Sequence, residues 1–560
     1  MRRIPLSSLR YPQTDPQSWN IIIWRNYPRQ YRYGFQSAPI PRGSNCYICH
    51  AHALTGLTGL PEAGHLIAAP YIRAQRLDTP AGSGSLDRHD NDADAGVDVK
   101  WNPSATGAVD LTVNPDFSQI ESDIAQITVN QRFAVFYPEK RPFFLEGFDL
   151  FDTPLQVAYT RTINAPRAGV RATGKIGGSA YTLLVTQDRG GGVTIIPGPL
   201  GNDLAPTDFR SYAAIGRLRH DVGSSFVGAV FTDREIRGGG HNRVIGPDFQ
   251  WRRNESDALT GQLLVSQTAD PDRPDVSPAW QGRSSTSHAF SLQWNHFVTK
   301  NDGFLRVRDL GDDFRADLGF IPQVGYREGT GEAGYHWWPE DRFLNYARVS
   351  GGGTYQTHDD RMIYADPYLG ANFIGRKNLQ SFATLHLNER IRVRDQVLSQ
   401  THLFWFAQID PSRRLPRISG SIDVGEAISF SQARVGRGVT LTFGSTVRPD
   451  PRLELSVNAS RQWLNVDGGR LFTAQVERLK AVYSFSSKSI VRVIGQYIGN
   501  SFPGDQHDGS FSGSVLYSYK LNWQTVLYAG YGDDRELTVN NDLVKLDRSF
   551  FFKVSYALQR

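Results

Sequence analysis

The sequence predicts an all-β fold in which most of the chain forms one large antiparallel transmembrane β-barrel. From Leu155 to the C-terminus, segments of about ten residues alternate apolar and polar side chains between turn residues, as barrel strands do. Aromatic residues make up 12% of the 560 residues, and glycine occurs 54 times. Mean hydropathy is −0.40. No apolar run reaches about 18 residues, which excludes membrane-spanning helices.

The strand pattern is clearest at residues 453–463. One face is apolar and the other polar, with Leu453, Leu455, Val457, Ala459 and Trp463 alternating with Glu454, Ser456, Asn458 and Ser460. Counting such segments predicts roughly 20–26 strands, with the even total of bacterial barrels. Charged and amide side chains on the polar faces indicate a water-filled lumen rather than a packed core. A soluble protein of stacked β-sheets is the alternative, because its strands would also alternate.

The predicted barrel covers residues 61–560. Residues 65–76 are interpreted as its first strand or as a lead-in to it. We expect its last strand at the C-terminus, where pairing of the last strand with the first would close the cylinder. Residues 83–96 are interpreted as a polar, acidic loop, and residues 96–101 and 107–113 as a hairpin. The triple glycines at 238–240 and 351–353 are interpreted as turns.

Residues 113–153 break the alternation. They contain two charged turns broken by proline, the sequence PEKRPFF and many phenylalanines. We expect this segment to lie inside the barrel or across its mouth as a plug or constriction, with its phenylalanines packed on the wall. The side chains expected to line the lumen or to fix the plug are Arg132, Glu139, Lys140, Arg141 and Glu146.

Part of this stretch carries a resemblance to a known family. NPDFSQIESD, FYPEKRPFFLEG and LFDT closely resemble a signature of a bacterial outer-membrane β-barrel family of uncharacterised function. Members of that family carry an N-terminal domain similar to family-9 carbohydrate-binding modules, and MRRIPLSSLRYP resembles the last strand of that module. The resemblance implies that residues 1–60 are a remnant of the module plus a linker loop, with the signal peptide and most of the module missing. Where the family often has YSRR, this chain has YTRT at 159–162.

Two cysteines form the only motif with cofactor chemistry. Cys46, Cys49 and His50 match the attachment motif of haem c, with two thioethers and an axial histidine. A disulfide between Cys46 and Cys49 is favoured in an oxidising periplasm, and a zinc site that includes His52 is a third alternative. We therefore expect no cofactor, with haem c as the alternative.

The chain offers little for catalysis or metal binding. Five carboxylates in the irregular stretch could supply a glycosidase pair, but ion pairing with the neighbouring basic residues explains them more simply; they are Glu121, Asp123, Glu139, Glu146 and Asp149. No nucleophile elbow, phosphate loop or HExxH sequence occurs. The alternating aspartates at 90, 92 and 94 lack the glycine and glutamate positions of a calcium loop, so no metal site is predicted.

The charge pattern excludes one class of partner. The 61 basic and 56 acidic residues are interspersed, so no nucleic-acid-binding face is predicted. We expect a non-enzymatic outer-membrane barrel, in contact with lipid, that binds or passes a small solute; the module of the resembling family suggests a saccharide. Two alternatives stay open, namely a haem-c-bearing component of an electron conduit and a carbohydrate-active hydrolase.

Overall fold

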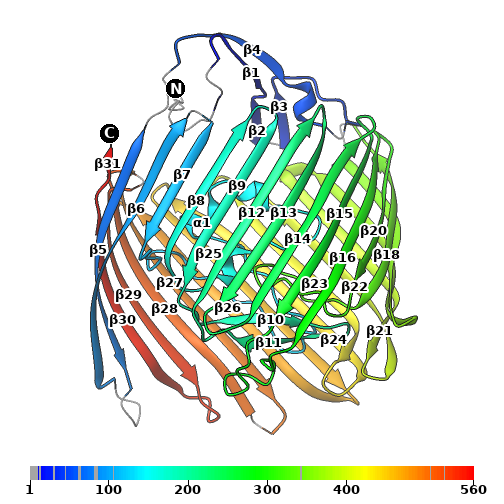
Figure 1. Ribbon diagram of the computed structural model, residues 1–560. Coiled ribbons are helices and arrows are strands. Elements are labelled where there is room, and N and C mark those ends of the chain that lie inside the picture. The colour runs from blue at the N-terminus through cyan, green and yellow to red at the C-terminus, as the bar shows by residue number, and fades with distance from the viewer. Residues whose placement is uncertain are drawn as a thin grey trace.

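The computed structural model is one closed β-barrel with small additional sheets (Figure 1). It describes residues 11, 14–28, 32–44, 46–60, 65–80, 86–104, 106–340, 343–504, 506–522 and 524–559. Within these residues the barrel has 24 antiparallel strands, an even number inside the predicted range. The prediction of one large barrel is therefore confirmed, and the alternative of stacked sheets is wrong.

The barrel strands follow one another around the wall in chain order. They are β5 (Leu66–Thr79), β6 (Arg88–Ser104), β7 (Gly107–Val113), β8 (Pro166–Ile176), β9 (Ser179–Asp188), β12 (Ser211–Val222), β13 (Ser225–Ile236), β14 (His241–Arg252), β15 (Asp257–Ala269), β16 (Ser284–Phe297), β17 (Asn301–Leu310), β18 (Tyr326–Trp337), β19 (Leu344–His358), β20 (Arg361–Gly375), β21 (Leu379–Val393), β22 (Gln396–Ile409), β23 (Arg417–Ser429), β24 (Arg434–Asp450), β25 (Leu453–Val466), β26 (Gly469–Ser484), β27 (Ser489–Phe502), β28 (Gln506–Lys520), β29 (Val526–Leu537) and β30 (Leu543–Ser555) with its continuation β31 (Leu558–Gln559).

The remaining elements are short. They are the strands β1 (Gln17–Ile21), β2 (Trp24–Pro28), β3 (Arg32–Gln36), β4 (His52–Leu57), β10 (Val193–Pro197) and β11 (Asn202–Pro206), the helix α1 (Pro142–Leu145), and the 3-10 helices η2 (Ile48–His50), η3 (Phe148–Phe151), η4 (Thr160–Thr162) and η5 (Arg376–Asn378). None of the helices in the described part of the chain is long and apolar enough to cross a membrane.

The barrel closes where its last strand pairs with its first. β30 runs antiparallel to β5, with Lys553 directly opposite Arg73. β31 continues the same seam, with Leu558 opposite Ala68. The predicted closure through the C-terminal strand is confirmed.

Apolar side chains cover the outside of the cylinder. Ile245 on β14 is 63% exposed, whereas its neighbour Val244 is 1% exposed and packs inward. Because successive side chains of a strand point to opposite faces, the alternation in the sequence separates an apolar outer surface from the interior. Exposed aromatic residues lie toward the same end of many strands, among them Trp101, Trp251, Trp294, Trp337 and Tyr519.

The two ends of the barrel differ. At the end drawn uppermost in Figure 1, here called the upper end, β1–β4 lie over the opening, and short turns such as 177–178 and 223–224 join the strands. Four long connections leave the opposite, lower end, and three of them, 114–165, 189–210 and 311–325, meet inside the barrel; the fourth is 270–283. The first three pack together in one apolar cluster, to which Leu155, Val157, Leu200, Phe314 and Val324 contribute.

Two interpretations of the sequence are corrected. Residues 88–96 of the predicted acidic loop belong to β6, because cross-strand partners on β5 neutralise their charge; Asp94 lies opposite Arg73 and is hydrogen-bonded to it. The glycines at 351–353 lie inside β19 rather than in a turn. A Cβ at Gly352 would come within 2.6 Å of the Gly331 carbonyl oxygen, so glycine allows a close approach there. The expected module strand at residues 1–12 lies, apart from Tyr11, outside the described residues.

Candidate functional site

Residues 114–165, here called the inner segment, connect β7 to β8 and extend beyond the predicted range of 113–153. They are hydrogen-bonded to wall residues from widely separated strands, which are Lys553 on β30, Arg478 on β26 and Gln262 on β15. A segment that contacts such distant strands runs across the interior of the barrel. Figure 1 shows its helix α1 within the outline of the wall.

Phenylalanines pack the inner segment against one side of the wall. Phe144 is 0% exposed and Phe151 is 1% exposed, in a cluster with Leu184 of β9 and Ile215 of β12. Phe143 and Phe148 pack against this cluster and are partly buried. Full burial of one such side chain stabilises a fold by roughly 1.5–3 kcal/mol, so these contacts hold the segment firmly to β9 and β12.

Glu139 and Arg141 form a buried ion pair within the inner segment. The Glu139 carboxylate accepts hydrogen bonds from Arg141 Nε and Nη2 at 2.9 and 2.6 Å, from the backbone N–H groups of residues 140 and 141, and from the Thr160 hydroxyl at 2.7 Å. Arg141 also donates to the carbonyls of Thr160 and Ile163. Burial acts to raise the pKa of Glu139, but these hydrogen bonds and the Arg141 charge hold it below its usual value. The pair therefore joins the charged turn to residues 160–163.

Glu121 ties the inner segment to β26 and β27. Its carboxylate lies 3.0 Å from Arg478 Nη2, 3.1 Å from Lys480 Nζ and 3.6 Å from Arg492 Nη1. Burial acts to raise the pKa of Glu121, but the three cations hold it below its usual value. Sequence reasoning considered Glu121 as a catalytic carboxylate or, more simply, as an ion-pair partner of neighbouring basic residues, because nothing local points to Arg478, which lies 357 residues later.

Lys140, which was predicted to line the lumen or to fix the plug, pairs within the inner segment. Its Nζ lies 2.9 Å from an Asp123 carboxylate oxygen, and the other oxygen lies 2.6 Å from Arg161 Nη2. Asp123 thus connects Lys140 of the charged turn to Arg161, which lies in the YTRT sequence where the resembling family often has YSRR. These side chains stabilise the segment's own fold.

Arg132 and Asn130 make contacts near the lower end. The amide of Asn130 donates to the Ile428 carbonyl and accepts from the Phe430 N–H, at 2.8 and 2.9 Å. Arg132 Nε donates to the Leu200 carbonyl at 2.9 Å, and its guanidinium lies over the Phe430 ring. Burial lowers the pKa of Arg132. The two residues join the inner segment to the β23–β24 turn and to the 189–210 connection.

Glu146 differs from the other predicted residues because it borders an open space. Its carboxylate lies 2.9 Å from Lys100 Nζ, which is 3.5 Å from Asp110. Lys100, Asp110 and Glu146 all line a cavity of about 420 Å³ between the inner segment and the wall. Arg132, together with residues 139–141, does not line this cavity.

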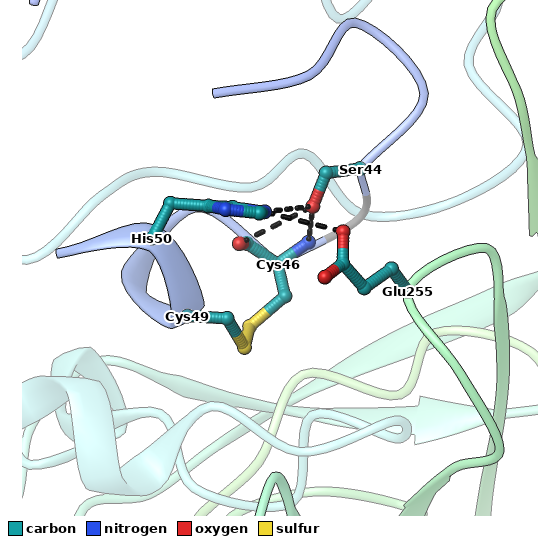
Figure 2. The surroundings of a disulfide bond; sticks show 5 residues. All are labelled: Ser44, Cys46, Cys49, His50 and Glu255. Atoms are coloured by element: carbon teal, nitrogen blue, oxygen red, sulfur yellow. Dashed lines mark hydrogen bonds and ion pairs between the residues drawn. A yellow bond between two sulfur atoms is a disulfide. The ribbon is translucent and has the colours of Figure 1, made fainter. Parts of the chain in front are cut away.

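Cys46 and Cys49 form a disulfide in the N-terminal region (Figure 2). In this state neither sulfur is available for a thioether to haem or for zinc. His50 Nε2 lies 3.0 Å from the Ser44 hydroxyl and 3.1 Å from the carboxylate of Glu255, which belongs to the turn between β14 and β15. The motif therefore connects the N-terminal strands to the upper end of the barrel.

Among the described residues, one group has the composition of a metal site. Asp312, His358 and Asp359 each place a ligand atom within 4.8 Å of the others, at the lower end of the barrel. Both carboxylates are exposed, and exposed acidic groups of this kind are common without an ion. No metal site was predicted at these positions.

Residues 65–173 match the family described as "Domain of unknown function (DUF5916)". This range includes the signature on which the resemblance rests; a domain similar to a carbohydrate-binding module is not part of the match. No curated protein sequence matches the chain.

Three solved structures illustrate the structural likeness. A ferric enterobactin receptor from Pseudomonas aeruginosa has a TM-score of 0.46 and 8% identity, over 88% of this chain and 81% of the receptor. The copper transporter OprC has a TM-score of 0.41 and 12% identity, over 91% and 83%. The channel DcaP of Acinetobacter baumannii has a TM-score of 0.28 and 10% identity, over 57% and 98%. With TM-scores below 0.5, these likenesses carry no argument about what this chain binds.

Proposed function

We propose that this chain is a non-enzymatic outer-membrane barrel whose inner segment plugs or narrows the lumen and controls the passage of a small solute. The observation that carries this proposal is the outer face of the cylinder. Apolar side chains are exposed on strands all around the closed wall, for example Ile245, Leu305, Leu369, Leu479 and Phe552. Such a surface is stable in lipid and is a liability in water.

The orientation follows from the connections. Bacterial outer-membrane barrels have short periplasmic turns and longer extracellular loops. We therefore place the upper end, with its short turns, in the periplasm and the lower end outside the cell. This places the Cys46–Cys49 disulfide in the oxidising periplasm.

The inner segment supports control of passage rather than a wide open pore. It enters from the lower end and is bound to opposite sides of the wall, through Glu121 on β26 and β27 and through Phe144 and Phe151 on β9 and β12. A constriction held at several points restricts the lumen to small solutes. We expect a saccharide as one solute, because the resembling family carries a module similar to carbohydrate-binding modules.

Single-channel recording in planar lipid bilayers tests the proposal. The informative variant replaces residues 118–135 by a glycine–serine sequence of equal length, and the matched control replaces the exposed lower-end turn at 538–542 in the same way. We expect small conductance from the wild type and the control, and a clearly larger conductance from the inner-segment variant. If neither the wild type nor the inner-segment variant inserts and conducts, the proposal is overturned.

A second variant tests the buried ion pair in the same recording. Glu139→Ala combined with Arg141→Ala removes the pair that joins the charged turn to residues 160–163. We expect more frequent open states, because the segment is then less rigid. Conductance and selectivity identical to the wild type would exclude these two residues from the control of passage.

A further inference from the structure

Two cavities lie where the first and last barrel strands meet. One, of about 420 Å³, is lined by Lys100, Asp110 and Lys553, and the other, of about 480 Å³, by Arg73 and Asp94. Both are also lined by Tyr71, Pro115, Asp116 and Phe117. Residues 114–119 of the inner segment, here called the strap, therefore separate the two cavities.

Two cationic side chains of the barrel wall lie next to each other beneath the strap. Arg73 on β5 and Lys553 on β30 are directly opposite each other across the seam. Like charges in such a cross-strand position repel each other unless an anion lies between them. Their side chains are only 18% and 7% exposed, so solvent screens this repulsion poorly.

Asp116 of the strap supplies the anion. One carboxylate oxygen lies 3.1 Å from Arg73 Nη1, and the other lies 3.1 Å from Lys553 Nζ. Lys553 Nζ also donates to the Asp116 carbonyl and to Gln119 Oε1, at 3.2 and 3.3 Å. The Tyr71 hydroxyl donates to the Asn114 carbonyl. The Asp116 carboxylate is thus the charged contact between the strap and the seam, beside hydrogen bonds that Asn114 and Gln119 make to the wall.

The site has unused hydrogen-bonding capacity. Arg73 Nε is buried without a hydrogen-bond partner, although Arg73 Nη2 is hydrogen-bonded to Asp94. The Ser518 hydroxyl, on the wall of the 420 Å³ cavity, is also buried without a partner. When Asp116 leaves, Arg73 keeps Asp92 and Asp94 as ion-pair partners, whereas Lys553 loses its partner Asp116. The rings of Tyr71 and Phe117 border both cavities and offer an apolar surface for the body of a ligand.

We propose that Arg73 and Lys553 form a binding site for the carboxylate of a small organic acid, and that Asp116 occupies this site in the resting state. A solute carboxylate that reaches the seam from either cavity replaces Asp116, releases the strap and joins the two cavities. Asp116 acts as an internal competitor, so the apparent Kd of the solute is its intrinsic Kd divided by the fraction of time that the Arg73–Lys553 site is free of Asp116. The inference rests on the proposed passage of solutes and adds small organic acids to the saccharide proposed above.

Equilibrium dialysis of the detergent-solubilised full chain tests the site, with labelled benzoate as the probe and benzamide as its uncharged match. Asp116→Asn removes the competing charge but keeps an oxygen that can accept the Ser118 N–H, which Asp116 Oδ1 accepts at 3.3 Å. We expect Asp116→Asn to bind benzoate at least about tenfold more tightly than the wild type, a gain of about 1.4 kcal/mol. Binding of benzamide should stay unchanged.

The matched control is Asp123→Asn, the same substitution in the same segment. Asp123 also contacts two cations, Lys140 and Arg161, but lines neither cavity. It should leave benzoate binding at the wild-type value. Adding Lys553→Gln to Asp116→Asn should abolish the gain in benzoate affinity. Lys553→Gln alone should bind benzoate more weakly than the wild type, and this variant tests the site if Asp116→Asn fails to fold.

The inference is overturned if Asp116→Asn leaves benzoate binding unchanged, if benzamide gains as much as benzoate, or if Asp123→Asn gives the same gain. The measurement requires neither a membrane nor a current, so it separates this inference from the proposed function. A channel that conducts in bilayers but shows no gain in benzoate binding refutes the carboxylate site alone. A chain that gains benzoate affinity but never conducts refutes the passage of solutes alone.

Discussion

Replacing Glu139 by alanine is expected to loosen the inner segment without unfolding the barrel. The side chains of Glu139 and Arg141 are 0% and 12% exposed, so the change leaves a buried guanidinium without its anion. Breaking such a pair from one side costs about 3–5 kcal/mol. Arg141 keeps its hydrogen bonds to the carbonyls of Thr160 and Ile163, so we expect the lower end of this range. The cost falls on the inner segment, because both partners belong to it.

Hydrogen–deuterium exchange of the protein in detergent measures this effect. A loss of about 3 kcal/mol accelerates the exchange of amides in residues 137–163 roughly 100-fold where they exchange by local opening. Glu146→Ala is the control, since its pair with Lys100 is 32% and 22% exposed and is worth about 1 kcal/mol or less. Adding Arg141→Ala to Glu139→Ala should restore part of the protection, because no buried charge is then unpaired. Equal acceleration in the Glu139 and Glu146 variants would refute the reasoning.

Three further predictions follow from the structure. The pKa of Glu121 is lowered, so its ion contacts stabilise the inner segment fully above about pH 4.3, the ordinary value for glutamate. This stability is lost as the pH falls through the lower folded value, and protection factors of residues 119–123, corrected for the intrinsic exchange rate, that do not fall in acid would contradict this. Ile245→Arg, in the apolar outer face, should lower the free energy of unfolding in lipid vesicles by about 2–4 kcal/mol, whereas Ile176→Arg, beside an upper-end turn, should lower it by at most about 1 kcal/mol. Equal losses would argue against a lipid-facing belt. Cys46 and Cys49 should resist alkylation until reduced, and a covalent haem band after expression with cytochrome maturation proteins would disprove the disulfide as their working state.

The sequence was informative where the physical signal is local. Alternation along one strand depends only on the two faces of that strand, and residues 453–463 show it directly. The interpretation was wrong where acidic residues or glycines inside a strand were taken for a loop or a turn. The acidic residues 88–96 were interpreted as a loop, although Arg73 on the neighbouring strand allows Asp94 to occupy β6. Glycines 351–353 were interpreted as a turn, although they make room between adjacent strands.

The candidate site was only partly predictable. The irregular, proline-broken and aromatic character of the inner segment identified it as the part of the chain with a special role. Of its charged residues, Glu139 and Arg141 pair locally, so their proximity was within reach of sequence reasoning. Asp116, which holds the strap at the seam, was not singled out, because its partners Arg73 and Lys553 come from opposite ends of the chain.

By itself, therefore, the sequence determined the class of fold, the two faces of each strand and the segment that interrupts them, because each of these depends on residues close together in the chain. Only the tertiary structure decided which wall residue meets which inner-segment residue. Closure of the cylinder brings β30 against β5 and places Arg478 beside Glu121. Such pairings depend on strand register and on the path of the inner segment, and no local pattern of charge or hydrophobicity encodes either one.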